Sequence, residues 1–313
     1  MIYEASLQRY NLIKALIRAL LKWGYFMLAT LCDVLKTAKE RKIAIGSFNV
    51  ISFETMRAVI DAAESLNLPV IIQFAQCHEA LIPLSMIGPA MVAAAKAAKV
   101  PVCVHLDHGE TLEYLEKALE IGFTAVMYDG STLPYAENLH NTKETVEMAR
   151  RTGASVEAEL GSMGRRESGA DDHTGAEDET KIYTDPILAA KFVKESGIDA
   201  LACSFGTTHG IYLTKPKLNL DIVREVCKLT GDIPVVMHGG SGVSAEDYRK
   251  NIEAGVRKIN YFTYMDKAGG AAIKEYVDSV ESGAPLFYSA ASTAARIAMT
   301  QDVREAMKRF AMM

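Results

Sequence analysis

Val104-His105-Leu106-Asp107-His108-Gly109 is the stretch of sequence that decides the fold. It ends an apolar run from 101 to 104 that is typical of a fully buried strand. Thr111 then offers a helix N-cap before apolar residues at helical spacing. An Asp and two His therefore lie where a buried strand gives way to a helix. In proteins built of parallel strands and helices, ligands bind at that end of a strand.

The same alternation of an apolar run and an amphipathic helix repeats along the chain. We predict eight strands, at 43–50, 69–74, 101–106, 124–128, 155–160, 199–205, 234–237 and 256–262. Two further helical stretches, 265–280 and 290–310, close the chain. Eight strand-helix units without a Pro-, Gly- or Ser-rich linker predict an α/β protein with one (β/α)8 TIM barrel, an extra N-terminal helix and C-terminal helices.

The first 26 residues differ from the rest. Apolar residues at helical spacing alternate there with basic ones, and three aromatic residues follow. We expect residues 1–26 to be a helical extension packed on a barrel formed by 27–313. Membrane-surface or organelle targeting is the alternative, since a basic amphipathic helix suits a lipid surface. The segment lacks the long apolar core and cleavage site of a signal peptide.

Composition limits the function. Of 313 residues, 49% are hydrophobic and 23% charged, as in globular proteins, and no apolar run approaches the about 20 residues that span a bilayer. The formal net charge of −5 argues against nucleic acid as a partner. Five scattered cysteines favour reduced thiols and a cytoplasmic location.

Polar residues follow several predicted strands, and a barrel would gather them at one rim. They are Asp107, His108, Asp129, Glu157, Glu159, His209, His238 and Asn260. A single His at a strand end is usually a hydrogen-bonded structural residue. Three of them, after three different strands and beside an Asp, favour a catalytic Zn²⁺ site, which uses three protein ligands and an open position.

Glycine-rich turns follow the last three predicted strands. They are His209-Gly210, His238-Gly239-Gly240-Ser241-Gly242 and Asn260-Tyr261-Phe262-Thr263. In TIM barrels, backbone N–H groups in the loops after strands seven and eight commonly hold a phosphate. Together with the His set, these turns predict a phosphorylated small-molecule substrate.

Five stretches, in order, resemble the class II, zinc-dependent ketose-bisphosphate aldolases, which include fructose- and tagatose-bisphosphate aldolases. They are 44–50 (AIGSFNV), 105–108 (HLDH), 157–161 (EAELG), 206–210 (GTTHG) and 238–242 (HGGSG). The resemblance covers about residue 27 to the C-terminus and leaves out residues 1–26.

The resemblance implies a role for each matching residue. His108, His209 and His238 would bind zinc, and Asp107 would be the acid/base for the C4 hydroxyl proton. Asp129 and Glu159 match acidic positions linked to metal movement or to a second divalent or monovalent cation. The dihydroxyacetone-phosphate part of the substrate would contact Gly210, Gly239, Gly240, Ser241, Asn260, Tyr261, Phe262 and Thr263, and Asn49 would also bind substrate.

The long polar loop after the fifth strand should supply a second catalytic residue, which by the resemblance is Glu167. Many family members have Gly-Gly where this chain has Arg165-Arg166. The alternative is a solvated acidic loop without a special carboxylate. The Arg pair could instead bind an anionic group at the far end of the substrate. Ala75 replaces a substrate-binding Ser of some members, which puts the aldehyde preference in question.

Two buried-looking residues have structural interpretations. His105 aligns with a position that does not bind metal, and we interpret it as structural or as a neighbour of the ligands. Lys258 is the only Lys near a strand end, so a class I aldolase with a Schiff-base Lys is disfavoured. We interpret Lys258 as a cation inside the barrel.

The sequence thus predicts a zinc-dependent aldolase that reversibly cleaves a ketose bisphosphate, such as fructose 1,6- or tagatose 1,6-bisphosphate, to dihydroxyacetone phosphate and an aldehyde. The resemblance implies a homodimer or homotetramer. Three alternatives stay open. They are a class II aldolase for another phosphoketose such as 6-phospho-5-dehydro-2-deoxygluconate, a metal-dependent phosphosugar epimerase, and a catalytically inactive barrel that binds a metabolite or a partner.

Overall fold

The computed structural model describes residues 27–161, 183–210, 212 and 216–313. The predicted N-terminal extension, 1–26, and the predicted loop base Glu167 lie outside the described residues.

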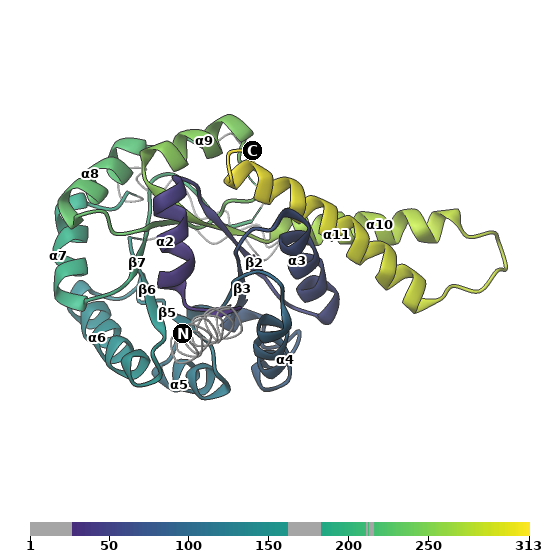
Figure 1. The fold of residues 1–313 in the computed structure, drawn as a ribbon, viewed down its shortest axis with the longest axis horizontal. Helices are drawn as coiled ribbons and strands as arrows, with labels where there is room; N and C mark the ends of the chain where they lie inside the picture. The colour runs from purple at the N-terminus through teal and green to yellow at the C-terminus, as the bar shows by residue number, and fades with distance from the viewer. Residues whose placement is uncertain (1–26, 162–182, 211, 213–215) are drawn as a thin grey trace, which may run out of the picture.

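A closed ring of parallel strands forms the centre of the molecule (Figure 1). Each strand pairs with the next along the chain, and the last pairs with the first. The strands are β2 (Ile45–Asn49), β3 (Val70–Ala75), β4 (Val102–Gly109), β5 (Ala125–Tyr128), β6 (Ser155–Leu160), β7 (Ala200–Cys203), β8 (Val235–Met237) and β9 (Val256–Tyr261). The predicted (β/α)8 barrel is confirmed. Each predicted strand overlaps one of these, although β3 and β4 end at Ala75 and Gly109, beyond the predicted ends at 74 and 106.

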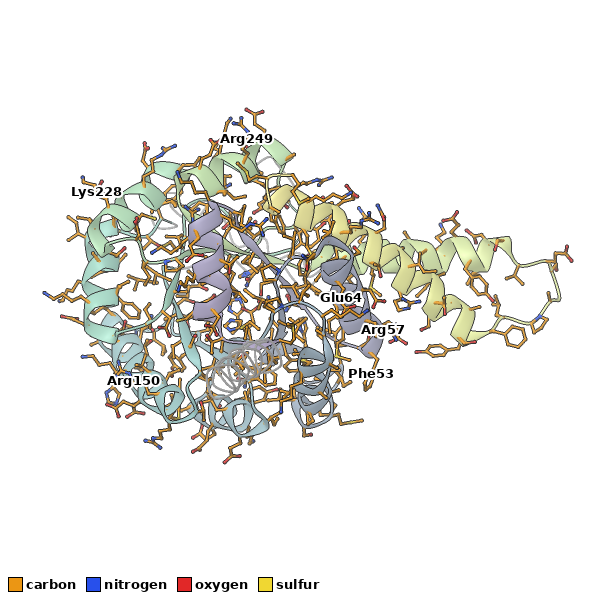
Figure 2. All side chains as sticks on the ribbon, viewed as in Figure 1. Phe53, Arg57, Glu64, Arg150, Lys228 and Arg249 are labelled. Carbon is orange, nitrogen blue, oxygen red and sulfur yellow. The ribbon has the colours of Figure 1, made fainter. Side chains whose placement is uncertain are left out.

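Helices surround the ring and bury their apolar faces on it. They are α3 (Phe53–Leu66), α4 (Leu84–Ala97), α5 (Leu112–Ile121), α6 (Tyr135–Thr152), α7 (Pro186–Ser196), α8 (Leu220–Thr230) and α9 (Ala245–Ala254). Charged side chains on their outer faces, such as Arg150, Lys228 and Arg249, point to solvent (Figure 2). Among the described residues, no helix combines the length and the apolar character that a membrane span requires.

A helix that the sequence analysis missed closes the amino-terminal mouth of the barrel. The short strand β1 (Leu28–Ala29) pairs with β4, and α2 (Leu31–Arg41) then crosses the mouth (Figure 1). Thr30 and Asp33 form a capping box that starts α2. The apolar face of α2 packs on the inward-pointing side chains nearest the amino-terminal mouth. The buried barrel-strand residues of this cluster are Ile45, Ile71, Cys103, Ala125, Ala200, Ala202 and Val236.

Two long helices complete the chain as an antiparallel hairpin, α10 (Thr263–Ser279) and α11 (Tyr288–Phe310). The predicted C-terminal helices are thereby confirmed. The second half of α11 packs on the barrel, where Phe310 is fully buried beside Phe48. The turn between the two helices projects far from the barrel as an arm (Figure 1).

The alternation of side chains along each strand sorts the barrel interior into layers. Apolar residues fill the layer next to α2. On β9, Lys258 and Asn260 follow toward the other mouth and contact interior carboxylates. Neighbouring strands also carry their inward-pointing polar residues toward this end, so the polar residues collect at the carboxyl-terminal mouth of the barrel.

Candidate active site

A pocket opens at the carboxyl ends of the strands, and it contains most of the predicted site residues. Asn49, Gln73, Ala75, Cys77, His78, Asp107, His108, His209, Gly210, Gly239, Gly240, Ser241, Asn260, Tyr261, Phe262 and Thr263 line it. Residues far apart in the sequence thus meet in one cavity, at the rim where TIM barrels carry out chemistry.

Three imidazoles from three different strand ends lie together here, with His108 and His209 lining the pocket and the fully buried His238 packed against both. The ring centroid of His108 lies 5.0 Å from that of His209 and 4.7 Å from that of His238, and the last two are 5.6 Å apart. One ring nitrogen of each lies within 4.8 Å of the others. This spacing lets the three nitrogens share one ion.

The backbone at the end of β4 explains how two consecutive residues both enter the site. Successive side chains of a regular strand point to opposite faces. Here the pairing of β4 with β5 shifts register between Leu106 and Gly109, and His108 has a φ of 43°. A non-glycine residue rarely adopts this left-handed conformation, which costs about 1–3 kcal/mol. The irregularity brings Asp107 and His108 into the same pocket.

Asp129, after β5, orients the imidazole of His108. Nδ1 of His108 lies 2.8 Å from Oδ2 of Asp129. Burial opposes the charge on His108, but Asp107 and Asp129 outweigh it and raise the pKa of His108 to about 10. Because the carboxylate of Asp129 holds Nδ1, Nε2 is the ring nitrogen that a metal would bind, in place of the proton there.

Two side-chain amides hold the carboxylate of Asp107. Nε2 of Gln73 donates to its Oδ2 at 2.9 Å, and Nδ2 of Asn260 donates to its Oδ1 at 3.2 Å. Burial favours the neutral acid, but the charges of His108 and Lys258 outweigh burial and lower the pKa of Asp107. The site therefore holds an ionised, fixed carboxylate beside the imidazoles.

Gln73 is a site residue that sequence reasoning missed. It lies in the middle of the apolar run VIIQFA, which indicated only a strand. Its Nε2 also donates to Oδ1 of Asn49 at 2.9 Å, and its Oε1 accepts from Ser47. A fully buried Gln within an apolar strand is costly unless it is hydrogen-bonded, and this was the available signal.

The buried groups near His238 fit a metal ion. Nδ1 of His238 and Oε2 of Glu159 lie 3.5 Å apart, and neither has a hydrogen-bond partner. Burial and the charge of Asp129 raise the pKa of Glu159 to about 8. Glu159, Asp129 and His108 form a second group that could hold a cation. Nitrogen and carboxylate donors of this kind suit Zn²⁺.

The turn after β8 and the start of α10 form a candidate anion-binding site. Gly239 has a φ of 64°, and a Cβ there would lie 2.2 Å from the carbonyl oxygen of Thr208. The N–H of Gly240 donates to the carbonyl of Asn260 at 2.9 Å, so Gly240 supplies close packing rather than a free donor. Ser241 lies beside the first turn of α10, where helix N–H groups attract anions.

Tyr261 and Phe262 contribute differently from their neighbours on β9. The ring of Tyr261 packs outside the barrel, with centroids 5.8 Å from Phe48 and 6.1 Å from Phe310. Phe262 lies beside His78, at 5.1 Å between ring centroids. The side chain of Phe262, with Ala75 and Cys77, forms an uncharged part of the pocket wall.

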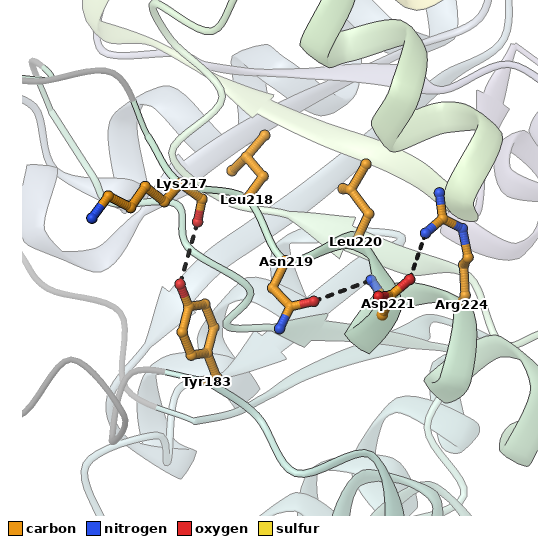
Figure 3. Close-up of a pocket in the computed structure, with 7 residues that line it drawn as sticks. All are labelled: Tyr183, Lys217, Leu218, Asn219, Leu220, Asp221 and Arg224. Carbon is orange, nitrogen blue, oxygen red and sulfur yellow. Dashed lines mark hydrogen bonds and ion pairs between the residues drawn. The ribbon is translucent and has the colours of Figure 1, made fainter.

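A second hollow lies on the surface and is lined by residues other than the three imidazoles (Figure 3). Tyr183 donates to the carbonyl of Lys217 there at 3.3 Å, and Arg224 pairs with Asp221 at 2.7 Å. Its described lining contains neither His nor Cys. We therefore assign the chemistry to the barrel mouth.

Comparisons with known proteins agree with this geometry. A family model described as fructose-bisphosphate aldolase class-II matches residues 29–313. The chain is 38% identical over 251 residues to a probable fructose-bisphosphate aldolase of Bacillus subtilis (strain 168), covering 79% of this chain and 86% of that protein. It is 35% identical over 255 residues to a fructose-bisphosphate aldolase of Staphylococcus aureus, covering 80% and 87%.

A solved structure is similar over nearly the whole fold. The crystal structure of the YdjI aldolase from Escherichia coli K12 matches with a TM-score of 0.79 at 34% identity, covering 90% of this chain and 97% of that chain.

Proposed function

This chain belongs to the class II fructose-bisphosphate aldolase family, a family of zinc-dependent lyases, and from that premise we propose that it cleaves a phosphorylated ketose reversibly into dihydroxyacetone phosphate and an aldehyde. The observation that carries the proposal is the meeting of three imidazoles beside the ionised Asp107, at a pocket that His108, His209 and Asp107 line. That combination suits breaking a carbon–carbon bond next to a carbonyl.

His108, His209 and His238 would hold the metal, with Asp129 and Glu159 close by for its movement or for a second cation. When bound there, Zn²⁺ supplies a Lewis acid for the carbonyl and enediolate oxygens of the substrate. His108 is already oriented for this role by Asp129.

Asp107 would accept the proton of the C4 hydroxyl during cleavage and return it to the aldehyde during synthesis. Its two oxygens are fixed by Gln73 and Asn260, so the carboxylate does not need to reorganise when substrate binds. A positioned carboxylate of this kind contributes about 10²–10⁴-fold to a proton-transfer step. The acid/base on the other carbon falls to Glu167, by family resemblance alone.

The phosphate of the dihydroxyacetone-phosphate part would bind between the β8 turn and the N-terminus of α10. Ser241 accepts the N–H of Phe262 at 3.1 Å, which leaves its hydroxyl hydrogen free to donate to a phosphate oxygen. Gly210, Gly239 and Thr263 line the same part of the pocket.

The identity of the aldehyde is the open part of the proposal, and a substrate panel with zinc present would decide it. We expect at least one of fructose 1,6-bisphosphate, tagatose 1,6-bisphosphate, 6-phospho-5-dehydro-2-deoxygluconate or a ketose 1-phosphate to release dihydroxyacetone phosphate or its analogue in a coupled assay. Turnover should disappear with a chelator and return with Zn²⁺. Isomerised phosphosugar without a cleavage product would favour the epimerase instead.

We also propose that the chain forms a homodimer or homotetramer through the arm. Leu286, Phe287 and Tyr288 at its tip are 56%, 60% and 81% exposed, and they lie far from the chain's own barrel (Figure 1). Light scattering should give an oligomer that Phe287→Glu dissociates, with Ile187→Glu on α7 as the exposed control. A monomeric native chain would reject the proposed oligomer.

The free cysteines support a cytoplasmic location.

A further inference from the structure

A fully buried chain of charges runs through the barrel beneath the three imidazoles. Nζ of Lys258 lies 2.8 Å from Oε2 of Glu157, and Oε1 of Glu157 lies 2.9 Å from Nε2 of His238. All three side chains have zero exposure. The aldolase chemistry above uses only the charge of Lys258, which lowers the pKa of Asp107, and gives Glu157 no part, although burying two charges is expensive.

The site around Glu157 is unsuited to a second cation. His105, Asp107 and Glu157 are close enough to hold an ion. However, the ammonium of Lys258 already lies against Glu157, and its charge would repel a metal there. Burial, and then Lys258, lowers the pKa of His105, whose Nε2 lies 3.6 Å from Glu157. Lys258 is therefore the cation that balances this carboxylate.

The pairing of Glu157 with Lys258 determines what Glu157 can do for His238. An ionised carboxylate accepts hydrogen bonds and donates none. The 2.9 Å contact therefore requires the proton of the neutral imidazole to be on Nε2. Nδ1 of His238 then carries the lone pair, and it is the nitrogen without a hydrogen-bond partner.

We propose that Lys258 and Glu157 are positioning residues that hold His238 in its Nε2–H tautomer, so that Nδ1 is ready to bind the metal. The inference rests on the proposed metal site, but the tautomer exists before any metal or substrate binds. His108 has the complementary arrangement, since Asp129 contacts its Nδ1. Two ligands are thus oriented by different carboxylates on different strands, one through each ring nitrogen.

The direct test is the tautomer of His238 in the metal-free native protein, measured by long-range ¹H–¹⁵N correlation spectra of ¹⁵N-histidine-labelled protein. We expect the Nε2–H form for His238, assigned by its loss in His238→Gln. An Nδ1–H form, or an even mixture of the two, would overturn the proposal. Neither outcome depends on whether the protein cleaves a phosphoketose.

A second test measures zinc affinity by competition with a chromophoric chelator. Glu157→Gln and the double variant Glu157→Gln/Lys258→Met should weaken Zn²⁺ binding by about 10–100-fold. The double variant removes both charges, so it leaves no buried charge unpaired. Cobalt-substituted protein should also show a changed visible spectrum in both variants.

The matched control is Thr124→Val. Thr124 is a partly buried barrel residue whose hydroxyl bonds to the carbonyl of Ala29 at 2.7 Å, away from the imidazoles. The Thr124→Val variant should have a lower unfolding temperature and an unchanged zinc affinity. A folded double variant that binds zinc as tightly as the native chain would overturn the proposal. So would a Thr124→Val variant that loses as much affinity.

Discussion

Nδ1 of His108 lies 2.8 Å from Oδ2 of Asp129, although the two residues end different strands. The contact holds in place a residue whose backbone is left-handed, with a φ of 43°. Ser131 in turn holds Asp129, because its hydroxyl donates to Oδ1 at 2.6 Å. Asp129, itself held by Ser131, therefore fixes the strained His108. A metal ligand is commonly oriented by such a second hydrogen-bonding partner.

Removal of the Asp129 carboxylate should weaken the metal site. We expect Asp129→Ala to raise the zinc dissociation constant by about 10–100-fold, because the ring of His108 loses the partner that orients it. Chelator competition measures the change. Asp221→Ala, which removes an exposed carboxylate in the surface hollow, is the control and should bind zinc normally. Equal affinity of Asp129→Ala and the native chain would refute this role.

Asp107→Asn should separate chemistry from metal binding. The amide keeps the shape of the carboxylate but cannot accept the hydroxyl proton, so we expect turnover to fall by about 10²–10⁴-fold. Metal analysis should still find zinc at the native stoichiometry. Steady-state cleavage assays check the rate. A variant that retains most of the native turnover would show that another group moves the C4 proton.

Gly239→Ala should damage phosphate binding. The residue has a φ of 64°, and the new Cβ would lie 2.2 Å from the carbonyl of Thr208, so the β8 turn must move. We expect KM for the phosphoketose to rise by about tenfold or more, equivalent to 1.4 kcal/mol. Gly270→Ala in α10 is the control, because its Cβ meets nothing within 4 Å. If both variants keep the native KM, the phosphate lies elsewhere.

The docking of α11 on the barrel should depend on pH through Asp302. Burial raises the pKa of Asp302, and its Oδ2 has no hydrogen-bond partner. A raised pKa in the folded state means that the stability this group contributes is present below the unfolded pKa and is lost as pH rises. Asp302→Asn should therefore raise the unfolding temperature by about 1–3 °C at pH 7.5.

That gain should shrink as the pH approaches 4, where the native Asp302 is protonated on folding. Differential scanning calorimetry at both pH values provides the measurement. A gain that is equal at both pH values, or larger at the acidic one, would contradict the assignment.

The barrel could be predicted from sequence because its strands are buried on both faces and appear as short apolar runs, such as 124–128. Helix α2 was not predicted because the alternation of apolar runs and amphipathic helices starts only at Ile43, although Thr30 and Asp33 carried a capping signal. The motifs around His108, His209 and His238 predicted a shared site because each lies at the end of a different strand. Their meeting depends on closure of the ring, which no local pattern encodes.

The supporting residues were harder to predict for a physical reason. Gln73 and Lys258 lie inside strands, and their partners Asp107 and Glu157 come from other strands. Periodicity shows that such a residue points inward, but only the closed barrel shows what it meets. The left-handed backbone of His108 could not be predicted from the sequence either, because it accompanies a register shift between β4 and β5.

The measurement that tests the central claim most directly is anomalous X-ray diffraction at the zinc edge, on crystals grown with Zn²⁺. We predict one strong peak about 2.0–2.1 Å from Nε2 of His108, Nδ1 of His238 and one ring nitrogen of His209. A zinc-loaded crystal with no peak among these three imidazoles, or with its zinc bound only elsewhere, would contradict the account.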